Sequence, residues 1–136
     1  MTPSPSYWDP LRRKEVAATP EERVRQWFIA ELEHRFCVPR HLMMSEVQMR
    51  FGRKPWRADI LVYDRAGQPL AIVECKREDV PLDADVLEQA LRYHAVLKAP
   101  FLFLTNGRQT LLYRRTPEGL VALDHVPAFE EMCSQS

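Results

Sequence analysis

The chain has 136 residues, a length that suits one domain with a single hydrophobic core. Its 19 basic and 19 acidic residues cancel, which excludes a global attraction to nucleic acid, so a basic patch has to be sought locally. No apolar run approaches the roughly 18 residues that cross a bilayer, and the N-terminus lacks an apolar stretch of the signal-peptide type. Its three cysteines are far apart and odd in number, so we expect reduced thiols and a cytoplasmic protein.

The chain is predicted to consist of an N-terminal arm, residues 1–18, and a single domain, residues 19–136. Prolines and basic residues fill the arm, which is expected to lie on the domain or stay mobile. The domain opens with a helix start, because Thr19 can cap the helix and Glu22 stands where a capping box needs an acid. Apolar residues then recur at helical spacing, which predicts an amphipathic helix that ends before Pro39.

A β-hairpin is the clearest feature of the next part of the chain. Residues 57–76 form two apolar segments joined by a polar turn in which Gly67 can take a positive φ. A shorter strand is expected at residues 46–50, followed by a turn at 51–56.

A second helix is predicted from Asp85 to about Lys98, because the segment Asp85 to Glu88 has the pattern of a capping box. The apolar run 101–104 is typical of a strand that is covered on both faces. Further strands and a short helix are expected at residues 109–115, at residues 120–123 and after residue 127. This order predicts an α/β fold with a mixed sheet, a right-handed parallel crossover and a helix on each face.

Charged residues stand at the ends of the two hairpin strands. Asp59 opens the first strand, and Glu74 and Lys76 close the second on the same face, because successive side chains alternate. Two carboxylates at one edge repel unless a cation lies between them, and hard oxygen ligands suit Mg²⁺ or Mn²⁺. Lys76 could orient or help deprotonate an attacking water. These groups together predict a site that hydrolyses a phosphodiester.

The same residues carry a resemblance to a known family. Asp59 followed by Glu74-x-Lys76 resembles the PD-(D/E)xK nuclease motif, although Ala58 stands where the family has a proline. The overall likeness, over residues 19–115, is to the N-terminal nuclease domain of type I restriction enzyme R subunits. It is carried by Thr-Pro-Glu-Glu-x-Val-Arg, Ala-Asp-Ile-Leu-Val-Tyr-Asp, Ile-Val-Glu-Cys-Lys, Gln-Ala-Leu-Arg-Tyr and Leu-Thr-Asn-Gly.

The resemblance implies a restriction-endonuclease-like αβββαβ core and a glutamate from the first helix in the metal site. Glu22 matches by position, but a glutamate of a capping box already has a structural role, and Glu31 and Glu46 are the other candidates. Gln89-x-x-x-Tyr93 resembles the QxxxY motif of a subset of these nucleases, and the two residues share one helix face. They would support the site or the substrate; the alternative is a core Tyr93 and a solvated Gln89.

Basic residues are dense just before Asp59 and could grip backbone phosphates, the alternative being an ordinary solvated turn. The candidates are Arg50, Arg53, Lys54 and Arg57, with Arg77 and Arg92 extending the grip. No base-reading module is recognisable, so sequence specificity is not predicted.

The predicted function is that of a Mg²⁺- or Mn²⁺-dependent DNA endonuclease or exonuclease. The sequence contains no Gly-x-x-x-x-Gly-Lys motif, so the helicase motor of restriction subunits is absent from it. We expect either that a partner, a helicase or restriction–modification subunit, supplies the motor or that the protein works without one. The alternative is a catalytically weak module of the same fold that binds nucleic acid or protein. A third possibility is that the same site and metal act on a phosphoester other than DNA.

Overall fold

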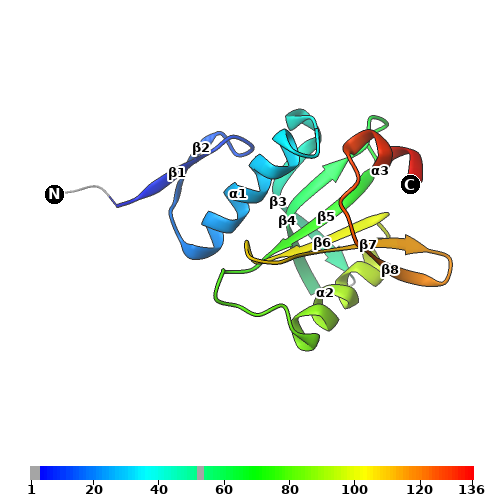
Figure 1. Cartoon of the computed structure of the whole chain (residues 1–136). Coiled ribbons are helices and arrows are strands. Elements are labelled where there is room, and N and C mark those ends of the chain that lie inside the picture. Colours follow the sequence, from blue (N-terminus) through cyan, green and yellow to red (C-terminus); the bar gives the residue numbers. More distant parts are fainter. Residues whose placement is uncertain (1–3, 52–53) are drawn as a thin grey trace.

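The computed structural model describes residues 4–51 and 54–136, without the side chains of 49–51, 54–56, 93 and 95–97 (Figure 1). The helices are α1 (Pro20–His34), α2 (Ala84–Leu97) and α3 (Phe129–Gln135), with a 3-10 turn at Arg40–Leu42. The strands are β1 (Ser6–Asp9), β2 (Lys14–Ala17), β3 (Met43–Phe51), β4 (Lys54–Tyr63), β5 (Pro69–Cys75), β6 (Phe101–Thr105), β7 (Thr110–Thr116) and β8 (Gly119–Leu123). None of the helices in this part of the chain has the length and apolar character needed to cross a bilayer.

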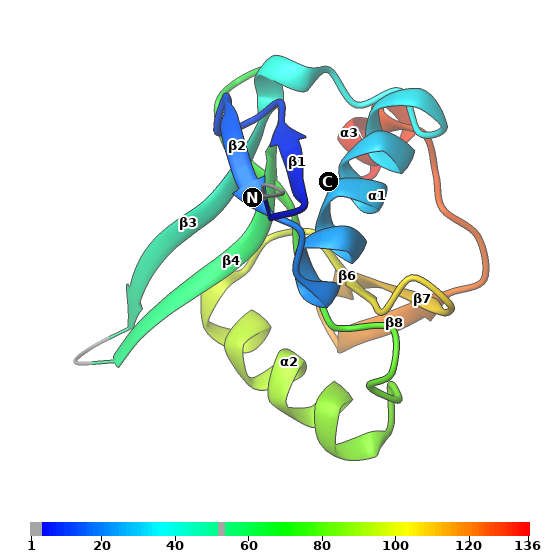
Figure 2. The ribbon, with the colours of Figure 1, turned by 90° about the vertical axis from the view of Figure 1, so that its left-hand side faces the viewer.

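A six-stranded mixed sheet forms the centre of the domain, with its strands in the order β3-β4-β5-β6-β7-β8. Only β5 and β6 pair in parallel, and α2 supplies the crossover between them. The helices α1 and α3 pack on one face, and α2 packs on the other (Figures 1 and 2). The predicted fold class, an α/β fold with a mixed sheet and a helix on each face, is confirmed.

The core lies on both sides of β5 and β6. All five residues of β6 are buried, as its uninterrupted apolar sequence predicted. On the α1 face, Phe28 meets Phe103 edge-on, with the ring centroids 5.4 Å apart. On the α2 face, Ala90 packs against Ile72 and Leu102. Both faces of the sheet are therefore covered, and the polar chemistry is confined to the ends of the strands.

The N-terminal arm folds into a small antiparallel hairpin of β1 and β2. Asp9 is fully buried at the end of β1, and its carboxylate accepts hydrogen bonds from the backbone of Leu11 and Arg12. The guanidinium of Arg12 reaches Glu22 on α1, with 2.6 Å between Nη2 and Oε1. Residues 4–18 thus lie on the domain through buried ion pairs.

The first helix begins where the sequence predicted. Thr19 is extended, with φ −77° and ψ 159°, and its hydroxyl accepts a hydrogen bond from the Glu22 N–H at 3.1 Å. Thr19→Ala is expected to lower the free energy of unfolding by about 1 kcal/mol, because one N–H of the first turn loses its acceptor. Urea unfolding measures this difference. Thr19→Ser keeps the acceptor, so a loss as large as that of the alanine variant would contradict the prediction.

Two boundaries differ from the prediction. The turn expected at residues 51–56 is shorter, because β3 runs to Phe51 and β4 starts at Lys54. Within the described part of the chain, the residues of β4 before Ile60 pair with β3 alone. The far end of the β3–β4 hairpin therefore projects beyond the other strands of the sheet (Figure 2). The second helix is capped by Asp83 rather than Asp85, since the Asp83 carboxylate accepts the Val86 N–H at 3.0 Å.

Candidate active site

A pair of carboxylates lies at the open end of the β4–β5 hairpin. The ladder between these strands starts at Ile60 and Val73, so Asp59 and Glu74 come next and face each other across the hairpin. Asp59 Oδ2 accepts the backbone N–H of Cys75 at 2.7 Å. The Asp59 side chain therefore continues the hydrogen bonding between the two strands and holds its carboxylate beside Glu74.

The surroundings of the pair disfavour two negative charges. Burial, followed by the charge of Asp59, raises the pKa of Glu74 to about 8. Burial also raises the pKa of Asp59, against the opposing effects of the Cys75 N–H and Arg25. Glu74 Oε1 is buried and has no hydrogen-bond partner among the residues that the structure describes. Near neutral pH the pair therefore retains a proton unless a cation takes its place.

Lys76 follows the pair at the end of β5. Its backbone N–H donates to the Thr105 carbonyl at 2.8 Å, which extends the contact between β5 and β6 by one residue. Its positive charge lowers the pKa of both Asp59 and Glu74. Lys76 therefore acts electrostatically on both carboxyl groups, and its role toward an attacking water stays a prediction.

The first turn of α1 carries two adjacent glutamates, the exposed Glu21 and the buried Glu22. The charge of Glu21 raises the pKa of both Asp59 and Glu74. Successive helical residues point about 100° apart, and the buried Glu22 instead accepts hydrogen bonds from Arg12 and Gln26. The structure thus places the Glu22 carboxylate against Arg12 and Gln26, and its role in a metal site stays a prediction.

The two other candidate glutamates also have different partners. Glu31 lies toward the far end of α1 and pairs with Arg35, with 3.4 Å between Nη1 and Oε2. Glu46 accepts a hydrogen bond from Arg25 at 2.7 Å and lies in β3 with a φ of +55°. Glu46 is therefore linked to Asp59 through Arg25, whereas Glu31 has no such link among the described contacts.

Arg25 is the main member of this region that sequence reasoning missed. Its side chain is buried on α1, and its Nη2 lies 3.4 Å from Asp59 Oδ1. The signal was present in the sequence, because Arg25 occupies the apolar stripe of α1 that continues through Phe28, Ile29 and Leu32. A charge on that stripe needs buried acidic partners.

The residues that were expected to support the site or hold the substrate are exposed, except for one whose side chain the structure does not describe. Gln89 is exposed on α2, and the side chain of Tyr93 is not described. Arg77 and Arg92 are exposed and pair with Asp79 and Glu88 at 3.1 and 2.9 Å.

The basic turn before Asp59 is described only at its end. Arg57 is exposed, with its Nη1 3.7 Å from Glu46 Oε2. Arg53 and the side chains of Arg50 and Lys54 lie outside the described residues. The placement of the basic cluster as a whole therefore stays a prediction.

The donor set of the pair fits a hard divalent cation. Within residues 4–51 and 54–136, no group of three or more His, Cys, Asp or Glu side chains forms a ready ligand set. Asp59 and Glu74 offer two carboxylates, and Mg²⁺ characteristically takes one or two carboxylates and keeps several waters. The unpartnered Glu74 oxygen is an acceptor that such a cation could take up.

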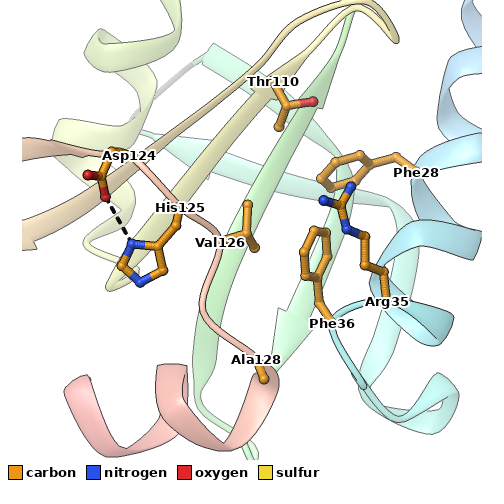
Figure 3. Close-up of a pocket in the computed structure, with 8 residues that line it drawn as sticks. All are labelled: Phe28, Arg35, Phe36, Thr110, Asp124, His125, Val126 and Ala128. Carbon is orange, nitrogen blue, oxygen red and sulfur yellow. Dashed lines mark hydrogen bonds and ion pairs between the residues drawn. The ribbon is translucent and has the colours of Figure 1, made fainter.

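Two cavities flank α1. One of about 260 Å³ lies at the start of α1 and is lined by Pro20, Arg77, Glu78, Asp79 and Arg108. Another, of about 550 Å³, lies between the end of α1, the start of β7 and the segment before α3 (Figure 3). It is lined by Phe28, Arg35, Phe36, Thr110, Asp124, His125, Val126 and Ala128. The lining of the smaller cavity includes Pro20 and Arg77, the sequence neighbours of Glu21 and Lys76.

Comparison with known proteins identifies the family. Residues 20–127 match the model of the type I restriction enzyme R protein N terminus. The chain belongs to this family. The match contains Asp59, Glu74 and Lys76 and starts after the β1–β2 hairpin. Over 50 residues, the chain is 38% identical to the type I restriction enzyme EcoAI endonuclease subunit of Escherichia coli, a stretch that is 37% of this chain and 6% of that subunit.

Two solved structures share the fold of this chain. A fragment proposed as an HsdR subunit of a type I restriction enzyme from Vibrio vulnificus has a TM-score of 0.50 and 22% identity, over 79% of this chain and 25% of that chain. A DUF820 protein from Anabaena variabilis, proposed as a nuclease, has a TM-score of 0.54 and 12% identity, over 98% and 88% of the two chains. The chain thus spans a small part of the restriction-enzyme relatives and nearly all of the DUF820 protein.

Proposed function

We propose that this chain is a divalent-metal-dependent DNA nuclease that hydrolyses phosphodiester bonds at Asp59, Glu74 and Lys76. The observation that carries the proposal is the partly buried carboxylate pair with an unpartnered oxygen, beside a lysine that acts on both carboxyl groups. Membership of the R protein N-terminal family and the likeness to a proposed nuclease support the same reading.

Each residue has a distinct task in the proposed reaction. Asp59 and Glu74 would hold Mg²⁺ or Mn²⁺, which when bound would supply Lewis-acid chemistry to the phosphate. Lys76 orients the attacking water and offsets negative charge on the phosphate oxygens. The Cys75 N–H keeps the Asp59 carboxylate in place, and Glu21 adds negative charge that favours a cation. Glu74 has to give up its proton before it can serve as a ligand.

The substrate would be held by its backbone. Arg57, Arg77 and Arg92 have exposed side chains, and the partners of Arg77 and Arg92, Asp79 and Glu88, are exposed residues whose ion pairs contribute little energy. Phosphate groups could therefore replace those partners. Gln89, and Tyr93 four residues later, would support the substrate from α2. We propose that a helicase or restriction–modification subunit directs the nuclease to its DNA, as the match to an endonuclease subunit suggests.

The test is a cleavage assay on supercoiled plasmid, linear duplex and single-stranded DNA with Mg²⁺, Mn²⁺ or EDTA. We expect cleavage with either metal and none with EDTA, together with a loss in Glu74→Gln. The matched control is Glu88→Gln, because Glu88 is an exposed glutamate of α2 that pairs only with Arg92 among the described residues. Protein that retains DNA in a gel shift but cuts none of the substrates, and titrates no Mn²⁺, would support the binding-module alternative instead.

A further inference from the structure

Arg25 connects three elements at the edge of the site. Its exposed fraction is 5%, and its guanidinium contacts acids on α1, β3 and β4. Nη1 lies 2.7 Å from Glu46 Oε1 and 3.5 Å from Glu22 Oε1, and Nη2 lies 3.4 Å from Asp59 Oδ1. Removing one member of a buried charge cluster leaves the others unpaired, which is costly. The Arg25 guanidinium is therefore held in this position by its acidic partners.

The Asp59 carboxylate is held at both oxygens by different parts of the chain. Oδ2 accepts the Cys75 N–H from within the hairpin, and Oδ1 faces Arg25 from α1. One contact alone would leave the carboxylate free to rotate about χ2, which is a broad torsion for aspartate. Contacts at both oxygens fix the plane of the carboxylate relative to Glu74.

A second arginine contacts two of the three acids that Arg25 contacts. Arg12, between β1 and β2, contacts Asp9, Glu22 and Glu46. Its Nη2 lies 2.6 Å from Glu22 Oε1, closer than the 3.5 Å from Arg25 Nη1 to that oxygen. Among the described contacts, Arg12 reaches the same cluster as Arg25 but does not touch Asp59.

We propose that Arg25 is a positioning residue that sets the orientation of the Asp59 carboxylate for catalysis. The catalytic consequence rests on the proposed nuclease function. The planar guanidinium is required because two of its nitrogens contact different acids at fixed angles. A lysine ammonium is a single point of charge and cannot hold Glu46 and Asp59 in that geometry.

Solution NMR of the Cys75 amide tests the orientation without any need for activity. We expect Arg25→Met and Arg25→Lys to move the Cys75 amide proton upfield and to speed its hydrogen exchange, because the hydrogen bond to Asp59 Oδ2 weakens. Arg12→Met is the matched control, since it removes an arginine from the same cluster and should leave this amide unchanged. Arg25→Lys keeps the charge, so it serves if Arg25→Met does not fold. An unchanged Cys75 amide in the folded Arg25 variants would overturn the proposal.

Cleavage kinetics test the consequence. In Arg25→Lys we expect kcat to fall by about 10- to 100-fold with little change in KM for DNA, because misorientation of a catalytic group lowers the rate rather than the binding. Arg12→Met should cost clearly less. If the two variants lost kcat equally, Arg25 would be a structural residue alone. Wild-type protein that cuts no DNA would refute the nuclease function, whereas the Cys75 amide would still decide whether Arg25 orients Asp59.

Discussion

Asp59→Asn is expected to lower the rate of metal-dependent DNA cleavage by about 100-fold or more. Asparagine keeps the shape of the side chain, and its carbonyl oxygen can still accept the Cys75 N–H. It removes the negative charge that would bind the cation and that faces Arg25. The change therefore isolates charge from packing, and initial rates at saturating Mg²⁺ or Mn²⁺ measure its effect.

The control for this variant lies on the same hairpin. Asp64→Asn makes the same chemical change at the β4–β5 turn, where Asp64 Oδ1 accepts N–H groups from Ala66 and Gln68. Its cleavage rate should stay close to that of the wild type, because asparagine supports the same turn. Asp59→Asn protein that is folded by circular dichroism and cuts DNA within threefold of the Asp64→Asn rate would remove Asp59 from the mechanism.

The free energy of unfolding of the metal-free protein is expected to fall as the pH rises from about 5 to 8, because of the ionisation of Glu74. Its pKa is raised from 4.5 to about 8 in the folded protein, by burial first and then by the charge of Asp59. Between these values the folded state binds more protons than the unfolded state, so the free energy of unfolding falls with pH. The slope for one proton is at most about 1.4 kcal/mol per pH unit. Glu74→Gln has no ionising group there and should lose this slope.

Urea unfolding at pH 5, 6.5 and 8 in EDTA measures the slope in the wild type and in Glu74→Gln. The stability advantage of the glutamine variant should grow with pH, whereas Glu88→Gln should follow the wild type because Glu88 is exposed. Mg²⁺ should bind more tightly at pH 8 than at pH 6 and release about one proton, which calorimetry in two buffers can count. Equal pH slopes in the wild type and Glu74→Gln would show that Glu74 ionises normally.

Much of this arrangement could be predicted because it depends on local patterns. Alternation along 57–76 gave the hairpin, and the ends of its strands placed Asp59 opposite Glu74. The capping residue Thr19 fixed the start of α1. The roles of these acids in metal binding and catalysis stay predictions, because the geometry shows their placement and not their chemistry.

The remaining features depend on contacts between distant segments. The surroundings of Glu22 depend on the N-terminal hairpin, because Arg12, between β1 and β2, reaches the Glu22 carboxylate. The burial of Arg25 depends on partners 21 and 34 residues further along the chain, Glu46 and Asp59. Neither the pairing of β1 with β2 nor its ion pairs to α1 has a periodic pattern from which it could be read.

The β4–β5 turn also offers a place for a label. It lies four residues of strand from Asp59, a separation of roughly 13 Å, and residues 65–69 are exposed. Gly67 itself has a φ of +82°, which disfavours a side chain, so the neighbouring Ala66 is the better position for a cysteine. Of the native thiols Cys37 is exposed, Cys133 is partly exposed and Cys75 is buried. A fluorophore at Ala66→Cys in a Cys37→Ser, Cys133→Ser background would therefore report on DNA binding without occupying the site.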